Sequence, residues 1–219
     1  MRTSLLKLLP AIALLALAGC QTSGSTSKEF PILIGESGQS DIRPCNGYGS
    51  YKDYMGNRYY VSGPDTKTQT RHQGIDFCAS AGTPVISGSS GTVERITREH
   101  PRRGGQVAIK TDFVATSRDA PDAKAFPIYL MYVHIRPEPS LQGLTRVEAG
   151  DVIGYLEPPG KSEIGPKSHV HFAASICTNQ DFCHTDPNRF WMKGPGIITC
   201  FDPKNPPKAD QIVAPLRCD

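Results

Sequence analysis

The sequence has 219 residues and a formal net charge of +3, from 24 lysines and arginines against 21 acidic residues. A chain of this length accommodates one domain with a sizeable core and short appendages. The small net charge gives no argument for nucleic-acid binding, and the sequence contains no basic stripe with interleaved aromatic residues. We therefore expect no nucleic-acid partner.

The first 20 residues have the pattern of an export signal. Basic residues precede an apolar run at 8–17, which is too short to cross a bilayer comfortably and ends in small residues. The sequence Leu-Ala-Gly-Cys that ends at Cys20 resembles the bacterial lipobox, which implies removal of residues 1–19 and lipid attachment to Cys20. Because Gln21 rather than Asp follows, the resemblance implies an outer membrane lipoprotein that faces the periplasm of a Gram-negative cell. The alternative is an ordinary signal peptide with a cysteine by chance.

Three segments follow the signal. Residues 20–44 begin with the lipidated cysteine and form a polar tether that is expected to be flexible. Residues 45–193 contain the β-rich domain, and residues 194–219 form a proline-rich tail that is expected to pack on that domain. Strand-forming segments alternate with turns in the domain, and we predict strands at 83–87, 92–97, 106–114, 128–135 and 152–156.

Two loops of the domain lie close in sequence to the histidine motifs described below. A hairpin tip is predicted at 100–105, where His100 is expected to be solvated. A long loop at 158–167 leads into His169, where it either borders a functional groove or serves as a neutral connection.

Seven cysteines are present, and the assignment of Cys20 to lipidation leaves six. An even number of cysteines in an exported protein indicates disulfides, although six cysteines allow fifteen pairings. Cys177–Cys183 is predicted because the short segment between these residues could cross a hairpin. Cys200–Cys218 could anchor the proline-rich tail, and Cys45–Cys78 is the pair that remains. Zinc binding by cysteines is disfavoured, because the sequence has no C-x-x-C pair.

Four of the six histidines and one aspartate fall in three short motifs. His72 and Asp76 are four residues apart, so they share one face of a strand or of a helical turn. His169 and His171 are two apart, which places them on one face of a strand but on nearly opposite sides of a helix. His134 lies near the end of a strand-forming segment. We therefore predict a sheet that presents all five side chains to one cleft.

Two imidazoles and one carboxylate suit Zn²⁺, and three protein ligands leave a fourth position for water, as in catalytic zinc sites. Bound zinc would lower the pKa of that water to about 7. Five groups are more than the metal needs, so the two surplus histidines are available to orient water, transfer protons or stabilise an oxyanion. From the spacing alone, scattered surface histidines are an equally good interpretation.

The order of the motifs resembles that of a known family, the lysostaphin/LytM-type zinc metallopeptidases (M23). The resemblance covers about 71–190 and rests on His72-Gln-Gly-Ile-Asp76, Gly82-Thr-Pro-Val85, Gly91-Thr-Val93, Tyr132-Val-His134, Val152-Ile-Gly154 and His169-Val-His171-Phe172. It implies a mainly β fold, a mostly antiparallel β-sheet with a metal-bearing groove and long loops. It aligns His72, Asp76 and His171 with the zinc ligands, and His134 and His169 with two catalytic histidines.

The function that this resemblance implies is zinc-dependent peptidoglycan endopeptidase activity, the hydrolysis of amide bonds in cell-wall stem peptides or crosslinks. The alternative is a non-hydrolytic or latent LytM-like regulator that activates cell-wall amidases, since some relatives of this fold have lost their metal ligands. All five positions hold the expected residue types here, which favours activity, and a purely structural zinc site leaves His134 and His169 unexplained. Ala173 stands where the family often has Glu, and 115–127 is longer than usual, which affects groove shape and substrate choice.

Overall fold

The computed structural model describes residues 44–52, 60–62, 67–115, 126–176 and 184–218. The predicted export signal, Cys20, most of the tether and the Cys177–Cys183 bridge lie outside these residues. Among the residues described, no helix is long and apolar enough to cross a membrane.

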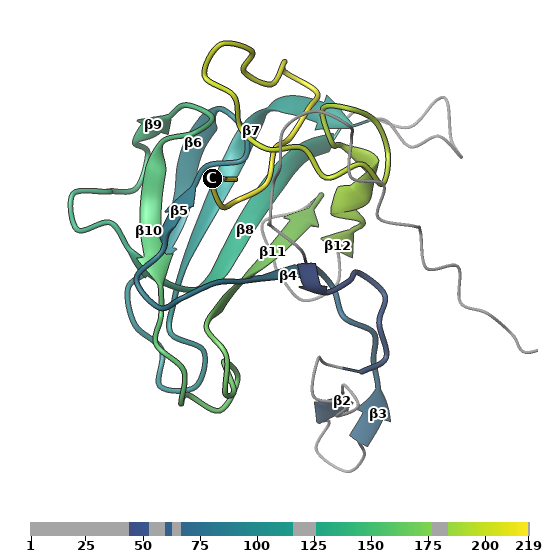
Figure 1. Ribbon diagram of the computed structural model, residues 1–219, viewed down its shortest axis with the longest axis vertical. Coiled ribbons are helices and arrows are strands. Elements are labelled where there is room, and N and C mark those ends of the chain that lie inside the picture. The colour runs from purple at the N-terminus through teal and green to yellow at the C-terminus, as the bar shows by residue number, and fades with distance from the viewer. Residues whose placement is uncertain (1–43, 53–59, 63–66, 116–125, 177–183, 219) are drawn as a thin grey trace, which may run out of the picture. The chain divides into compact units, whose positions relative to one another are not determined.

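One large sheet organises this part of the chain, and all of its strand pairs are antiparallel (Figure 1). Its main path, in spatial order, is β1 (Pro44–Asn46), β4 (Ile75–Cys78), β11 (His169–Ser175), β8 (Phe126–Pro137), β7 (Gly105–Ala115), β6 (Gly91–Thr97) and β9 (Arg146–Val147). The mainly β, antiparallel fold predicted from the sequence is therefore confirmed, and each of the five predicted strands is present with its ends shifted by at most two residues.

The remaining elements are short. The large sheet extends off its main path: β10 (Val152–Leu156) pairs with β8 and with β5 (Pro84–Ile86), and β12 (His184–Thr185) pairs with β11. A separate hairpin consists of β2 (Tyr60–Ser62) and β3 (Lys67–Gln69), and η1 (Pro187–Arg189) is a 3₁₀ turn.

Strand β8 lies at the centre of the sheet, and its eight residues from 128 to 135 are all buried. A strand buried on both faces needs an apolar run rather than an alternating pattern, and Ile128–Ile135 has one except at His134. The exception is informative, because a polar side chain within a buried run needs a partner or a function.

The strand register separates the two faces of the sheet. Phe172 is opposite Tyr132, which is opposite Val107, and these side chains form the main core. Because side chains alternate along a strand, the neighbouring row lies on the other face. That row runs Asp76, His171, Val133, Gln106 across β4, β11, β8 and β7. The register alone therefore places Asp76 and His171 side by side on the face opposite the core.

The core face is covered by residues 190–218, which follow η1 and which we call the C-terminal segment; Figure 1 shows it in yellow across the sheet. Buried side chains of this segment join the core, namely Trp191, Ile212, Ala214 and Leu216. Its backbone is hydrogen-bonded to the β5–β6 region, with Ile86 N–H donating to Pro215 O at 2.8 Å and Val213 N–H donating to Gly88 O at 2.9 Å. Gly88 permits this approach, since a Cβ there would lie 2.7 Å from Val213 O.

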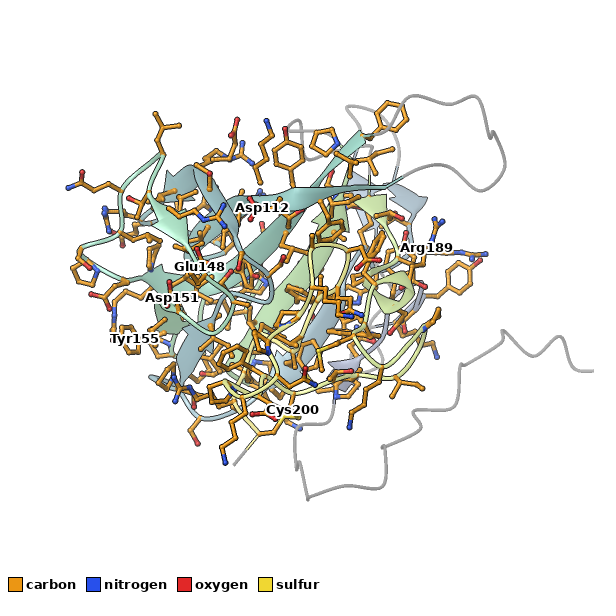
Figure 2. The ribbon with its side chains drawn as sticks, turned by 90° about the horizontal axis from the view of Figure 1, so that it is seen from above. Asp112, Glu148, Asp151, Tyr155, Arg189 and Cys200 are labelled. Carbon is orange, nitrogen blue, oxygen red and sulfur yellow. A yellow bond between two sulfur atoms is a disulfide. The ribbon has the colours of Figure 1, made fainter. Side chains whose placement is uncertain are left out.

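Two of the predicted disulfides are confirmed. Cys45–Cys78 joins β1 to β4, and Cys200–Cys218 closes the C-terminal segment on itself, each with a Cα–Cα distance of 5.8 Å. Cys200 is labelled in Figure 2.

Candidate metal centre and its histidines

Three side chains predicted to bind zinc converge at one point. His171 on β11 is directly opposite Asp76 on β4, and its Nδ1 lies 3.0 Å from Asp76 Oδ1. His72, four residues before Asp76, places its Nε2 3.0 Å from the same oxygen and 2.9 Å from His171 Nδ1. One donor atom from each residue lies within 4.8 Å of the other two. Two imidazole nitrogens and one carboxylate oxygen in this arrangement fit a zinc ion with three protein ligands.

The protonation states of these groups suit metal binding. Burial raises the pKa of Asp76, but hydrogen bonds with His171 and His72 outweigh it and hold the pKa well below the ordinary value. Burial lowers the pKa of His171, although its hydrogen bond with Asp76 opposes this effect. The carboxylate is therefore ionised and the His171 ring is neutral at pH 7, which are the forms that bind a metal ion.

Backbone groups near β1 orient His72. Its Nδ1 donates to Gly47 O at 2.9 Å, so that Nε2 faces Asp76. Two backbone hydrogen bonds of 2.8 Å, from Gly49 N–H to His72 O and from His72 N–H to Ser50 O, hold the two segments together. A second hydrogen bond that fixes the ring of a ligand histidine is typical of metal sites. No sequence pattern indicates this contact, because a backbone carbonyl can come from any residue type.

Gly74 lies beneath the ring of His171. A Cβ at this position would lie 2.7 Å from Cε1 and Nε2 of His171 and 2.7 Å from Phe172 O. Side-chain carbons do not approach other atoms so closely, so the site requires glycine here. The glycine in the His72–Asp76 motif was the available sequence signal for this role.

The two surplus histidines join the same group. The ring centroids of His134 and His169 are 4.7 Å apart, and those of His134 and His171 are 6.3 Å apart. His169 Nε2 lies 4.0 Å from Asp76 Oδ1. The structure therefore brings together all five residues that the sequence predicted, whereas His100 lies in the β6–β7 hairpin and His184 in β12.

Each surplus histidine donates Nδ1–H to a backbone carbonyl. His134 donates to Arg103 O at 2.8 Å, and His169 donates to Lys167 O at 3.0 Å. A carbonyl only accepts hydrogen bonds, so Nδ1 carries the proton in both rings. In a neutral ring Nε2 is then unprotonated and can accept a proton.

His134 reaches the site through a β-bulge. Gly105 pairs with Ile135 and Gln106 pairs with Val133, which leaves His134 as the extra residue of β8. Its φ of 68° lies in the left-handed region, which is strained for a residue with a side chain. Bulges re-aim side chains next to functional sites. Burial, together with His169 and His171, lowers the pKa of His134 to about 3, so the ring is neutral at pH 7.

A sequence model described as peptidase family M23 matches residues 70–182. Similar solved structures include LytU (24% identity, 79% of this chain and 94% of that chain covered, TM-score 0.47) and the catalytic domain of lysostaphin from Staphylococcus simulans (22%, 67% and 90%, 0.46). A zinc-containing peptidase from Vibrio cholerae is also similar (20%, 70% and 37%, 0.42). No curated protein sequence matches.

The family match spans more than half of the chain and includes all five residues of the site. The strands that carry them are antiparallel, and the His72, Asp76 and His171 donor set fits zinc. The chain therefore belongs to peptidase family M23, the zinc metallopeptidases.

Proposed function

We propose that this protein is a zinc-dependent peptidoglycan endopeptidase that hydrolyses an amide bond in stem peptides or crosslinks of the bacterial cell wall. The observation that carries the proposal is the arrangement of His134 and His169. They stand beside a three-ligand metal group, are outside the ligand set, and each has its Nδ1 proton held by a backbone carbonyl. A site that only bound metal for structural reasons would not need them.

In the proposed reaction His72, Asp76 and His171 hold the metal. When bound, zinc lowers the pKa of a coordinated water and polarises the carbonyl of the bond to be cleaved. The unprotonated Nε2 of His134 or His169 accepts a proton from the attacking water and later returns it to the leaving amine. While it holds that proton, the Nε2–H of the same ring donates a hydrogen bond to the oxyanion that develops on the substrate carbonyl, and the unprotonated Nε2 of the other ring accepts a hydrogen bond that orients the attacking water.

The experiment uses the chain from Gln21 onward, which lacks the lipidated cysteine, with purified crosslinked peptidoglycan. Samples are zinc-loaded, EDTA-treated, or carry His169→Ala, and the products are identified by mass. His184→Ala is the control, because His184 belongs to β12 and not to the site. We expect cleavage that EDTA and His169→Ala abolish and His184→Ala preserves. Absence of cleavage by a folded, zinc-containing chain would favour the alternative, a LytM-like activator of cell-wall amidases.

We also propose that the protein is anchored through lipid on Cys20 to the outer membrane, facing the periplasm. The support is the sequence Leu-Ala-Gly-Cys after an export signal, with Gln21 following. Disulfides such as Cys45–Cys78 agree with an oxidising compartment. Fractionation of cells that express the full chain checks this proposal. We expect the wild-type protein in the outer-membrane fraction and expect the Cys20→Ala variant to be lost from that fraction.

A further inference from the structure

Two loops meet beside His134. One is the tip of the β6–β7 hairpin, and the other is the 157–168 connection between β10 and β11. Glu163 in the second loop joins them: its Oε1 lies 3.2 Å from Arg102 Nε and its Oε2 lies 3.2 Å from Arg103 Nε. Its backbone N–H also donates to Arg102 O at 3.0 Å. We call the contacts of Glu163 with Arg102 and Arg103 the Glu163 clasp.

The hairpin side of the clasp holds His134. Arg103 contributes its carbonyl to Nδ1 of His134 and its guanidinium to Glu163. The turn around it is ordered by His100, whose Nδ1 accepts from the backbone N–H groups of Arg102 and Arg103 at 3.3 Å. His100 O accepts from Gly104 N–H at 3.0 Å. A shift of this turn therefore moves the carbonyl that orients His134.

The other side of the clasp is attached to both histidines. Glu157, at the start of the loop, donates its N–H to His134 O at 3.0 Å and accepts from Ser168 Oγ at 2.7 Å. Lys167, at its end, supplies the carbonyl for His169 Nδ1. The loop is thus fixed at its two ends, whereas Glu163 in the middle is tied to the hairpin through the clasp.

The orientation and tautomer of the His134 ring depend on its hydrogen bond at Nδ1. The residue has a left-handed backbone in a bulge, so the sheet register does not by itself determine where the ring points. Loss of the Nδ1 hydrogen bond would allow the proton to move to Nε2, the atom needed as acceptor. The Glu163 side chain is 35% exposed, and ion pairs at such positions contribute little to global stability. We therefore expect the loss of the Glu163 side chain to have a local effect, with little change in the global stability.

We propose that Glu163 is a positioning residue: by holding Arg102 and Arg103 it keeps the Arg103 carbonyl on Nδ1 of His134, and with it the tautomer that proton transfer requires. The kinetic part of this inference rests on the proposed endopeptidase activity. The structural part concerns His134 alone and is independent of turnover.

The test compares Glu163→Ala with the wild type in the zinc-loaded chain from Gln21 onward. The matched control is Glu148→Ala, another glutamate in an exposed ion pair, whose Oε1 lies 2.9 Å from Arg146 Nε. Glu148 is labelled in Figure 2. ¹⁵N NMR of the imidazole rings reports the tautomer of His134. We expect the Nδ1–H form in the wild type and in Glu148→Ala, and a measurable Nε2–H population in Glu163→Ala with unchanged zinc content. kcat should fall by about 10-fold in Glu163→Ala, with KM changed less than about twofold.

A second variant tests whether the effect of Glu163→Ala depends on the side chains of Arg102 and Arg103. Arg102→Met with Arg103→Met removes both guanidinium groups but keeps the Arg103 carbonyl. We expect this variant to reproduce the tautomer change of Glu163→Ala, and the addition of Glu163→Ala to it to have no further effect. Additive effects, or a wild-type tautomer in Glu163→Ala, would overturn the inference. A tautomer change in a chain that hydrolyses no peptidoglycan would uphold the positioning role and overturn only the proposed function.

Discussion

The four histidines of the site differ in which ring nitrogen faces the centre. His72, His134 and His169 each donate Nδ1–H to a backbone carbonyl, of Gly47, Arg103 and Lys167 respectively. His171 instead turns Nδ1 toward Asp76 and His72. Backbone carbonyls therefore determine the tautomer of three rings, and a carboxylate orients the fourth.

Removal of a proposed ligand and removal of a proposed catalytic histidine should have different effects. His171→Ala takes away one of three donor atoms, and we expect it to lose both bound zinc and hydrolysis. His134→Ala leaves the donor set intact, so zinc content should stay near that of the wild type while kcat falls by about 10²-fold or more. Metal analysis of the dialysed variants, together with kinetics, checks both. Full zinc content in His171→Ala would contradict the ligand assignment.

Gly74→Ala tests the close approach beneath His171. The new Cβ would lie 2.7 Å from the ring, so the ring or the β4 entry must shift. We expect zinc affinity to fall by about 10-fold or more, as for other changes that disturb ligand orientation. A chelator competition assay measures this affinity. Gly143→Ala is the control, since nothing lies within 4 Å of a Cβ there, and equal affinities in the two variants would contradict the steric argument.

At the scale of elements, the short strand β1 has more influence on the site than its three residues suggest. It pairs with β4, which carries Asp76, and the Cys45–Cys78 bridge joins the two strands covalently. The chain that leaves β1 supplies the Gly47 carbonyl for His72. The bridge therefore holds the backbone that orients a proposed zinc ligand.

Replacement of this bridge by serines, in Cys45→Ser with Cys78→Ser, should lower both stability and zinc affinity. A bridge between residues 33 apart is expected to contribute roughly 3–4 kcal/mol to the free energy of unfolding. Zinc affinity should also fall, because the Gly47 carbonyl is less firmly held. Cys200→Ser with Cys218→Ser is the comparison, since it should destabilise the chain with less effect on zinc affinity. Calorimetry of unfolding and chelator competition measure the two quantities, and equal zinc affinities in the two double variants would refute the link to His72.

The strands and the convergence of the proposed ligands could be predicted because they depend on residue type and spacing. Apolar runs such as that of β8 indicated the strands, and the two-residue spacing of His169 and His171 indicated a shared strand face. The bulge at His134 could not be predicted, because it depends on how β7 and β8 pair across a long separation in the chain. The carbonyls of Gly47 and Arg103 were missed because every residue has one.

At the scale of the whole molecule, the large sheet carries the C-terminal segment on its core face. Trp191 packs on Phe77 and Phe172, with ring centroids 6.4 and 6.0 Å apart. Phe201 lies against Gly150, where a Cβ would not fit and the φ is 90°. The C-terminal segment is therefore part of the core, and its loss would expose the apolar side of the strands that carry the site.

Ile212→Ala measures this contribution. Ile212 is 0% exposed, and truncation of a fully buried aliphatic side chain costs about 2–5 kcal/mol in the free energy of unfolding. Leu144→Ala is the control, since Leu144 is 81% exposed and should change the stability by less than about 0.5 kcal/mol. Denaturant unfolding gives both values. Similar stabilities for the two variants would mean that the C-terminal segment lies on the sheet without supporting it.

The position of Ile212 and Leu216 in the core also sets the order of events during synthesis. These residues are made after every strand of the sheet, so all of the strands are synthesised before their cover exists. A nascent chain that stops short of them leaves apolar side chains of β4, β8 and β11 in water and cannot complete its fold. His72, Asp76 and His171 then have no rigid frame to hold them together. Translation itself thus delays assembly of the site until the C-terminal segment has been added.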